Sequence, residues 1–570
     1  MNPLYKLQTH ILVYLILPTF FCFFSTKALG NSAPIYGNFI QQWLYSHWND
    51  EQWEQEFAYM QSVGMESIIV QDVANRNGSR WDVYYPSSLP NTHHVNNSLE
   101  KIFEKASQHG IKLYIGMGFD PDWWNWDLSK AGDAQKYFDA MTKSTQIIDE
   151  VYRLFQPRYP DVFHGFYCVY EIWNHWTWDQ EQTRNQYVDN LSYGFNLVIN
   201  ALDAINPEMP FLFSPFSRTF PWCATKENTQ LFYESFFTKT NFRPQDGILP
   251  MDDVGGGGQT LDTVEAWIKM YADAIQNTGN KLHYYVNIEN FVEPPGDKLW
   301  DTPDTPLFGI NYWSSAPLER FVRQLEVAQR YAEKIFCFSF SHYYSPVNNI
   351  PGFYDAFVHY LETGEIDSEY PSSPSKVFFN MENVLNTATS QNVNILKIRW
   401  EGVNDNYGIM RVNLYKGENL VAYRTAIRKD VYNQASEPPF IYYPEYIADA
   451  IPYRLGTVDV WGNETVSVPF QIDLSAGYFE FPEVTTSCIS LDRTKRIESP
   501  ICYINRDKNV ECLFESDRDE ELHITLFSVT GASLYNGKIR AKKGINIYTF
   551  PVKNNTPGRF FITLNPVKNR

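Results

Sequence analysis

The sequence predicts an α/β fold, a closed (β/α)8 TIM barrel, followed by two all-β sandwich domains. From residue 35 to about 365, short β-type apolar runs alternate with amphipathic helical stretches, which is typical of a parallel sheet built from βα units. Near residue 372 the pattern changes to period-two alternation, with turn residues about every eight to twelve positions, which is typical of β-sandwiches. The length of 570 residues also exceeds what one hydrophobic core accommodates.

Eight strands are expected in the first part of the chain, at residues 36–43, 67–73, 112–119, 163–172, 211–216, 247–254, 282–292 and 335–341. Helical segments are expected at residues 52–63, 99–109, 134–155, 180–205, 261–277, 318–334 and 354–363. Eight strands with intervening helices over about 330 residues favour a closed barrel over an open sheet. A doubly wound fold is the alternative, but no glycine-rich phosphate loop follows the first strand.

Residues 1–30 are predicted to be a secretory signal peptide, and the barrel domain is expected at residues 31–368. The segment has an early Lys6, an apolar run over residues 11–24 and small residues at its end. The apolar run is shorter than the roughly 20 residues that span a bilayer, and no later segment replaces it. We therefore expect an exported protein without a transmembrane segment, in the periplasm, on the cell surface or outside the cell. Cys22 leaves lipid attachment open.

The chain is acidic, with a formal net charge of -19 at pH 7. Loss of the signal peptide would remove two lysines and no acid, so the mature protein would be more acidic still. Nucleic-acid binding needs a basic stripe, and the sequence has none, so no nucleic-acid partner is expected. The cysteines are scattered without a Cys-x-x-Cys pair, so we expect no zinc site. No metal, no cofactor and a monomeric state are predicted.

Two stretches after the barrel resemble known modules. Residues 369–484 contain LKIRW at 396–400, DNYGIMRVNLY at 405–415 and YRLGTVD at 453–459, and this part resembles a fibronectin type III module. Residues 485–570 contain LHITLFSVTG at 522–531, GINIY at 544–548 and PGRFFITL at 557–564. This end is similar to the sorting domains of type IX secretion cargo, which implies secretion machinery as a partner. A plain accessory sandwich is the alternative.

Aromatic side chains point to a carbohydrate ligand. Of the sixteen tryptophans, fourteen fall between Trp43 and Trp313, and several cluster in loop-like stretches at residues 123–126 and 173–178. Some of these rings must belong to the core. Flat rings that cannot all be buried are suited to stacking on the faces of sugar rings.

Two glutamates are the candidate catalytic residues. The fourth predicted strand ends near Glu171 and the seventh near Glu289, each within an otherwise apolar and aromatic run. The active site of a (β/α)8 enzyme lies at the carboxyl ends of its strands, and strands four and seven face each other across the barrel. Taken singly, each of the two residues is equally consistent with a structural role, as a buried glutamate paired with Arg or Lys. Together, the two carboxyl groups could flank a glycosidic bond, one protonated and one charged.

This arrangement resembles the retaining glycosidases of clan A, whose acid/base ends the fourth strand and whose nucleophile ends the seventh. The resemblance implies that Glu171 is the acid/base and Glu289 the nucleophile. The chain departs from the clan because Tyr170, rather than asparagine, precedes the acid/base, and Asn174 follows three residues later. The motifs YGNFIQQW at 36–43 and GMESII at 64–69 also resemble a largely uncharacterised family of bacterial glycosidase-like barrels, which implies a glycosyl hydrolase but supplies no substrate.

Other polar and aromatic residues near the strand ends are candidates for substrate binding, because hydroxyl-rich ligands need donors and acceptors around a stacking ring. They are Gln42, Trp43, Gln71, Asp72, Asp120, Trp124, Trp173, Asn174, Asp252, Asn287, Trp313, His342 and Tyr343. Asp252 and Asp253 also leave an inverting mechanism or a metal site open. Adjacent strand residues point to opposite faces, so at most one of these two enters the barrel mouth.

The sequence therefore predicts a secreted glycoside hydrolase that acts on a poly- or oligosaccharide. A catalytically inactive sugar-binding protein is the first alternative, and convergence of Glu171 and Glu289 would discriminate against it. A polysaccharide lyase is the second, although a lyase would need Lys or Arg beside a Tyr or His base, and the mouth is acidic. The four glycines at residues 255–258 are expected to form a flexible loop over the mouth.

Overall fold

The computed structural model describes residues 35–293, 300–301, 313–386, 391–429, 434–444, 446–481, 501–504, 510–516, 520–528, 533–550 and 560–566. The predicted signal peptide and Cys22 lie outside the described residues. The chain divides into two compact units, residues 1–482 and residues 483–570, which we describe separately.

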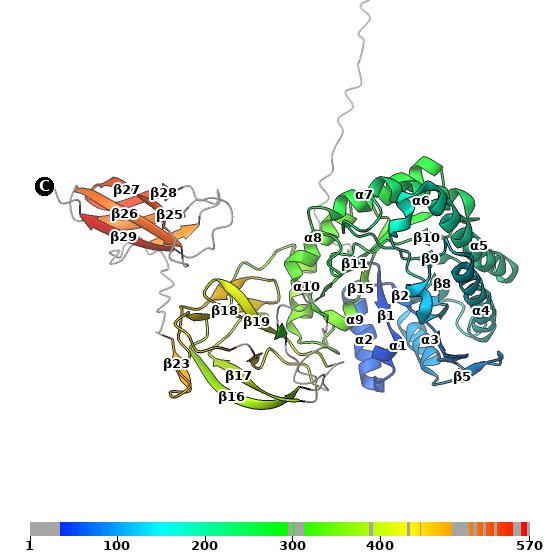
Figure 1. Cartoon of the computed structure of the whole chain (residues 1–570), viewed down its shortest axis with the longest axis horizontal. Coiled ribbons are helices and arrows are strands. Elements are labelled where there is room, and N and C mark those ends of the chain that lie inside the picture. The colour runs from blue at the N-terminus through cyan, green and yellow to red at the C-terminus, as the bar shows by residue number, and fades with distance from the viewer. Residues whose placement is uncertain are drawn as a thin grey trace, which may run out of the picture. The chain divides into compact units, whose positions relative to one another are not determined.

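The first unit contains the closed parallel barrel that the sequence predicts (Figure 1). Its strands follow one another around the barrel in the order of the chain: β1 (Gly37–Ile40), β2 (Ser67–Val70), β6 (Lys112–Gly116), β8 (Phe163–Cys168), β9 (Phe211–Phe213), β10 (Gly247–Ile248), β11 (His283–Glu289) and β15 (Lys334–Phe338). All eight are shorter than the sequence suggests, because the carboxyl half of most predicted strands leaves the sheet and lines the end of the barrel that we call the mouth.

Helices surround the barrel: α2 (Asp50–Ser62), α3 (Ser98–His109), α4 (Ala131–Phe155), α5 (Glu181–Ile205), α6 (Lys226–Lys239), α7 (Val264–Thr278), α8 (Leu318–Ala328) and α10 (Gly352–Thr363). Each of them buries apolar residues on one face, as in the run of Phe232, Tyr233, Phe236 and Phe237 on α6. Helix α6 was not predicted, although these residues recur at helical spacing.

Short elements fill the loops at and beside the mouth. They are α1 (Gln42–Tyr45), η1 (Pro121–Asn125), η2 (Trp176–Asp179) and α9 (Phe340–Tyr343), together with the two-stranded sheet of β12 (Phe291–Val292) and β14 (Ser314–Ser315). A four-stranded sheet of β3 (Ala74–Asn77), β4 (Arg80–Val83), β5 (Thr92–His94) and β7 (Gly118–Phe119) follows the second and third barrel strands. This sheet was not predicted, because its strands are short and half-polar.

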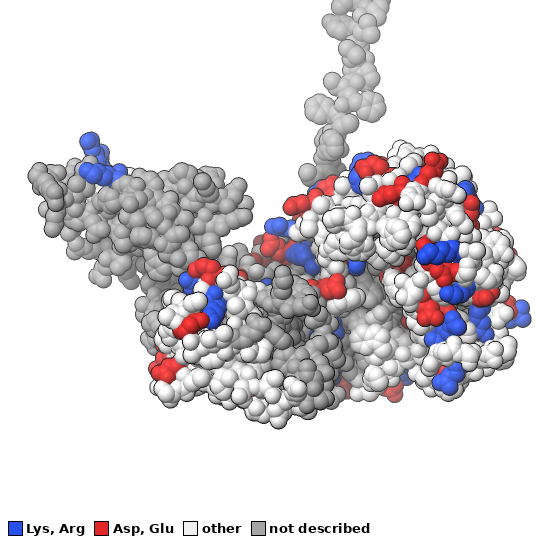
Figure 2. Space-filling view, viewed as in Figure 1, with Lys and Arg blue, Asp and Glu red and all other residues white. Residues whose placement is uncertain are grey.

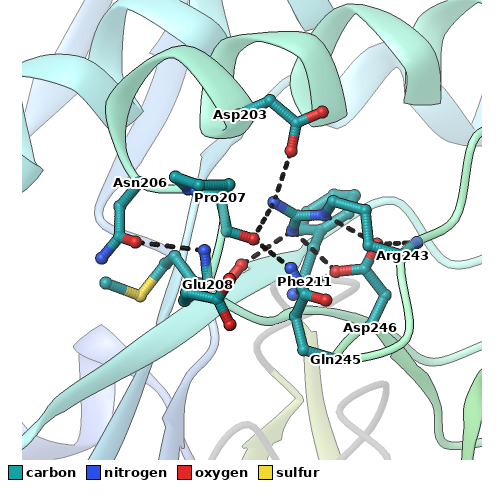
Figure 3. A network of polar contacts seen from close by, with 9 residues as sticks. Asp203, Asn206, Pro207, Glu208, Phe211, Arg243, Gln245 and Asp246 are labelled. Carbon is teal, nitrogen blue, oxygen red and sulfur yellow. Dashed lines mark hydrogen bonds and ion pairs between the residues drawn. The ribbon is translucent and has the colours of Figure 1, made fainter.

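A polar network ties the strands together at the amino end of the barrel (Figure 3). The guanidinium of Arg243 donates to Asp246 at 2.7 Å, to Asp203 at 3.1 Å and to the Met209 carbonyl at 2.7 Å. Asp246 directly precedes β10 and accepts a further hydrogen bond, 3.0 Å long, from the backbone N–H of Phe211 at the start of β9. A buried charge here therefore has several partners, which is what makes its burial tolerable.

The rest of the first unit is mainly antiparallel β-structure against the barrel. One sheet has the order β20 (Ile441–Tyr443), β17 (Gln391–Glu401), β16 (Lys376–Asn386), β23 (Tyr478–Glu480), and the other has the order β13 (Trp300–Asp301), β19 (Asn419–Thr425), β18 (Ile409–Lys416), β21 (Tyr453–Asp459), β22 (Glu464–Val466). Strands β13 and β19 form a parallel pair. The backbone of Leu318 donates to Val460 at 2.9 Å, and Trp461 belongs to the same buried cluster as the barrel core. This part therefore buttresses the barrel.

The second unit consists of two three-stranded antiparallel sheets. Their strands are β24 (Ile501–Ile504), β25 (Val510–Ser516), β28 (Gly544–Phe550) and β27 (Ser533–Ala541), β26 (Glu520–Ser528), β29 (Phe560–Pro566). The α/β barrel followed by β-sandwich-like sheets confirms the predicted fold class. The resemblances to a fibronectin type III module and to a sorting domain, and the exact domain boundaries, stay predictions.

Charge and hydropathy of the described residues add two findings. None of the described helices is long and apolar enough to cross a membrane. Figure 2 shows Lys and Arg side chains interspersed with Asp and Glu over the helices of the barrel, rather than gathered in one basic area on this face. Such a surface gives a phosphate backbone no continuous attraction.

Candidate active site

The two predicted glutamates lie at the carboxyl ends of barrel strands that two other strands separate. Glu289 is the last residue of β11, and Glu171 follows the end of β8 by three residues. Strands β9 and β10 lie between them on one side of the barrel, and four strands lie between them on the other. Glu171 is half-buried, whereas Glu289 is only 4% exposed. The two glutamates therefore lie at strand ends on opposite sides of the same mouth.

Glu171 is held near a barrel strand end and is easily protonated. The side-chain amide of Gln71, which follows β2, lies 3.5 Å from Oε1 of Glu171, and the indole N–H of Trp123 donates to its carbonyl at 2.9 Å. Burial raises the pKa of Glu171 to about 7; repulsion by Asp253 adds to this, and Arg218 opposes it. A carboxyl group with this pKa can hold a proton at neutral pH, as a general acid must.

Glu289 is more tightly fixed. Its Oε2 accepts a 2.8 Å hydrogen bond from the backbone N–H of Gly256, and its carbonyl accepts from Arg320 at 2.9 Å and from Gln324 at 3.0 Å. Burial raises the pKa of Glu289 well above its usual value, and repulsion by Asp253 and then Asp252 adds to this. Asp253 therefore acts on the pKa of both glutamates, which indicates that the three carboxyl groups share one site.

The adjacent aspartates after β10 have different roles. Asp252 accepts hydrogen bonds from the Glu289 N–H at 3.2 Å and from Gln324 on α8 at 2.5 Å, so its carboxyl group faces away from the mouth. Asp253 instead pairs with Arg218 at 3.0 Å. The expectation that only one of the two enters the mouth agrees with these contacts, which favour Asp253. Substrate binding by Asp252 stays a prediction.

Three further predicted binding residues are engaged within the protein. Asn174 is fully buried, and its amide binds the backbone of Arg218 and Ala224 at 2.9 to 3.0 Å. Asp120 caps η1 and forms a 2.6 Å ion pair with Arg76. These contacts position the loops at the mouth, and substrate binding by Asn174 and Asp120 stays a prediction. Asp72 accepts a 2.5 Å hydrogen bond from Asn75, and burial raises the pKa of Asp72 to about 6.

The remaining polar candidates vary in accessibility. Gln42 and Gln71 are half-buried, and the buried Oε1 of Gln71 has no hydrogen-bond partner among the described residues. Asn287 lies two residues before Glu289 on the same face of β11, and its Oδ1 is likewise buried without a partner in the described part of the chain. His342 and Tyr343 are buried, so they support the rings around them rather than offering a surface.

Exposed tryptophans occur on several sides of the mouth. Trp43 is 47% exposed and its ring lies 4.8 Å from that of His342, while Trp313 is 40% exposed and stacks on Phe291 at 4.2 Å. Trp124 is also exposed. Trp173 is half-buried against the exposed Trp222, with ring centroids 6.0 Å apart. Three of the four tryptophans among the candidate substrate-binding residues are therefore exposed.

Comparison with protein families identifies the family to which this barrel belongs. The sequence model of a domain of unknown function, DUF4434, matches residues 35–350. The chain belongs to the DUF4434 family. This match spans all eight barrel strands, so it confirms the predicted resemblance to a family of uncharacterised function. A comparison with curated proteins finds no match.

Solved structures similar to the DUF4434 chain are glycoside hydrolases. One is a proposed α-L-fucosidase from Bacteroides thetaiotaomicron, with 18% identity, 57% of this chain and 95% of that chain covered, and a TM-score of 0.43. An intracellular xylanase from Thermoanaerobacterium saccharolyticum has 15% identity, 53% and 84% covered, and a TM-score of 0.30. A chitinase catalytic domain from Ostrinia furnacalis has 11% identity, 59% and 97% covered, and a TM-score of 0.33. The functional proposal rests on the residues of the mouth.

Sequence reasoning missed several residues of the DUF4434 mouth. Arg218 and Trp222 lie in the loop after β9, between aromatic residues that gave no sign of a polar site. Asp253 has a backbone φ of 50°, so it has left the regular strand that the sequence predicted there. Among the described residues, no group of three or more His, Cys, Asp or Glu has the geometry to hold a metal ion.

Proposed function

We propose that the protein is a glycoside hydrolase that cleaves glycosidic bonds in a poly- or oligosaccharide, with retention of configuration. The observation that carries the proposal is the pair of carboxyl groups at the ends of β8 and β11, on the half-buried Glu171 and the buried Glu289, both repelled by the same Asp253. Two carboxyl groups whose environments oppose ionisation are what acid/base cleavage of a glycosidic bond needs.

In the proposed reaction Glu171 starts protonated and gives its proton to the leaving glycosidic oxygen. Ionised Glu289 attacks the anomeric carbon as that bond breaks, which gives a covalent glycosyl-enzyme. Glu171, now a carboxylate, takes a proton from a water molecule as the water attacks the same carbon. The sugar leaves with its original configuration, and Glu171 is protonated again.

The raised pKa of Glu289 sets a condition on this mechanism. A nucleophile has to be ionised, and the Gly256 N–H and the nearby Arg320 favour the ion, whereas Asp252 and Asp253 oppose it. The three mouth carboxyl groups of Glu171, Asp253 and Glu289 therefore titrate as a coupled set, not as independent residues. Glu289 can ionise at neutral pH when two conditions hold. Arg218 compensates the charge of Asp253, and the proton that the coupled carboxyl groups share resides on Glu171.

The exposed tryptophans support binding of sugars by stacking, and they also suit the alternative of a non-catalytic carbohydrate-binding protein. The pair of carboxyl groups favours the enzyme, since a binding surface gains nothing from acids that repel one another. We further propose that the protein is exported, with residues 1–30 as signal peptide and residues 485–570 as a sorting or accessory domain; the sequence patterns of these segments support this.

The test begins with the purified protein and a panel of polysaccharides, with the anomers of the products followed by NMR. Glu171→Gln should still form the glycosyl-enzyme from an activated aryl glycoside and then stall, because no base remains for water. Azide should restore turnover and give a glycosyl azide of retained configuration. Glu66→Gln, which alters an exposed acid at the amino end of β2, is the matched control. Products of inverted configuration, or no azide rescue, would count against the proposed roles.

A further inference from the structure

The four-glycine segment at residues 255–258 is part of the built site and not the flexible loop that the sequence suggested. The carbonyl of Gly255 accepts from the Glu293 N–H, and the carbonyl of Gly258 accepts from both the N–H and the hydroxyl of Thr219, each at 2.9 Å. Gly255 and Gly258 are buried. The glycine turn is thus tied to the loop after β9 on one side and to the loop after β11 on the other.

Two carboxyl groups press against this turn. A side chain on Gly256 would clash with Oδ1 of Asp253, and a side chain on Gly258 would clash with its Oδ2 and with Arg218. A side chain on Gly255 would lie 2.9 Å from Oε2 of Glu289. Only glycine allows the backbone to approach both carboxyl groups this closely.

The same turn supplies a backbone donor to the candidate nucleophile, since Gly256 N–H lies 2.8 Å from Oε2 of Glu289. Asp253 itself adopts a φ of 50°, a conformation that costs free energy for a residue with a side chain and persists only when the surroundings impose it. The positive φ, the ion pair with Arg218 and the glycine turn therefore meet at Asp253, a residue to which the proposed reaction gives no step of its own.

We propose that Asp253 is a positioning residue for Glu289: paired with Arg218 and enclosed by the glycine turn, it keeps the Gly256 N–H aimed at the Glu289 carboxylate. The acids that face Asp253 are Asp252 and Glu293, besides Glu171 and Glu289 themselves, and Arg218 is its cation. Only the activity readouts below rest on the proposed function.

A substrate-free test uses the melting temperature of the full chain between pH 5 and pH 8. Burial raises the pKa of Asp253 to about 7 and that of Glu289 well above its usual value, so the folded state loses stability as pH rises from about 4 through 7. Asp253→Asn should flatten this loss, and in a Glu289→Gln background the same change should flatten it less. Asp262→Asn, which alters an exposed acid nearby, should leave the slope unchanged. Additive effects of the two substitutions would overturn the proposal.

A second test separates geometry from charge. Gly256→Ala and Gly258→Ala retain every charge but displace the turn, so kcat on a substrate found in the panel should fall about 10- to 100-fold with KM changed less than about threefold. Gly132→Ala on α4 meets open space and lies outside the glycine turn, so it is the matched control. This control should keep kcat within about threefold.

The outcomes distinguish the two proposals. If Glu289→Gln stays active, the proposed function fails, while the non-additive pH slope can still hold. If Gly256→Ala and Gly258→Ala match Gly132→Ala in kcat while Glu289→Gln is inactive, the positioning role fails alone. Should the alanine variants not fold, Asp253→Asn adds no atoms to the site, and an unchanged kcat in that variant overturns the positioning role.

Discussion

The amino end and the mouth of the barrel differ in how their buried charged side chains are paired. At the amino end Arg243 has Asp203, Asp246 and a backbone carbonyl around it, and Asp246 in turn accepts from the start of the next strand (Figure 3). At the mouth, Glu171, Asp253 and Glu289 crowd together, and Arg218 is ion-paired with only one of them. The buried charges at the amino end have partners of opposite charge, whereas the acids at the mouth repel one another.

Stability and chemistry therefore reside at different ends of this barrel. Acids that repel each other in a buried place destabilise the fold, so their presence at the carboxyl ends of the strands is a cost that function explains. The paired network at the amino end belongs to the face that barrels use for stability. Changes at the mouth should therefore alter activity while sparing the fold, and changes at the amino end should do the reverse.

The largest effect is expected for Glu289→Gln. Loss of the nucleophile should reduce kcat by about 10⁴-fold or more, since the remaining residues cannot form the glycosyl-enzyme. The melting temperature at pH 8 should equal or exceed that of the wild type, because a buried and repelled acid is gone. Kinetics with an activated aryl glycoside and calorimetry check both halves. A less stable variant with full activity would reverse the proposed division between the two ends.

Arg243→Ala is the counterpart at the amino end. It leaves Asp246 fully buried without its cation, which should cost about 3–5 kcal/mol of unfolding free energy. Activity per folded molecule at low temperature should stay near that of the wild type. Arg153→Ala removes an exposed ion pair with Asp149 on α4 and should cost about 0.5 kcal/mol at most. Denaturant unfolding measures both, and equal losses would show that the network has no special role.

The barrel was predictable from the sequence because each strand and most helices carry their own apolar pattern. The strand ends placed Glu171 and Glu289 at the mouth for the same reason, since topology alone fixes where parallel strands end. Asp253 could not be chosen over Asp252 in this way, because the choice depends on a backbone φ of 50° and on contacts with Arg218 and Gln324. Long-range contacts of this kind leave no local pattern.

The loops also contribute residues to the mouth whose roles the sequence does not predict. Arg218 reaches the mouth from the loop after β9, where neighbouring Phe216 and Phe220 lie within 5.1 and 5.6 Å of its guanidinium. In the sequence those aromatic residues look like core. The glycine turn looked flexible, whereas close approach of two carboxyl groups explains its composition.

A smaller effect is expected on the pH dependence of kcat. Glu171 must be protonated to act as the acid, and its pKa is about 7, so kcat should decline above that pH, by about tenfold per unit. Asp253→Asn removes a repelling charge, which lowers the pKa of Glu171, and should move this decline to lower pH. Glu66→Gln at the amino end should leave the profile in place. A decline at the same pH in all three proteins would show that the mouth acids are not coupled.

The smallest effect is expected for the rim of the mouth. Trp222 is 54% exposed and contacts Trp173, two residues after Glu171, so it offers a ring beside the site without supporting the core. Trp222→Ala should weaken sugar binding by about 0.5–1.5 kcal/mol, the range for one aromatic contact, and raise KM about threefold to tenfold with kcat little changed. Tyr193→Ala, a comparably exposed aromatic residue on the outer helix α5, is the control and should leave KM unchanged. Binding of the same sugar to Glu289→Gln, followed by calorimetry, separates stacking from chemistry. If Trp222→Ala binds as tightly as the control, the loop after β9 contributes charge to the mouth through Arg218 but no sugar platform.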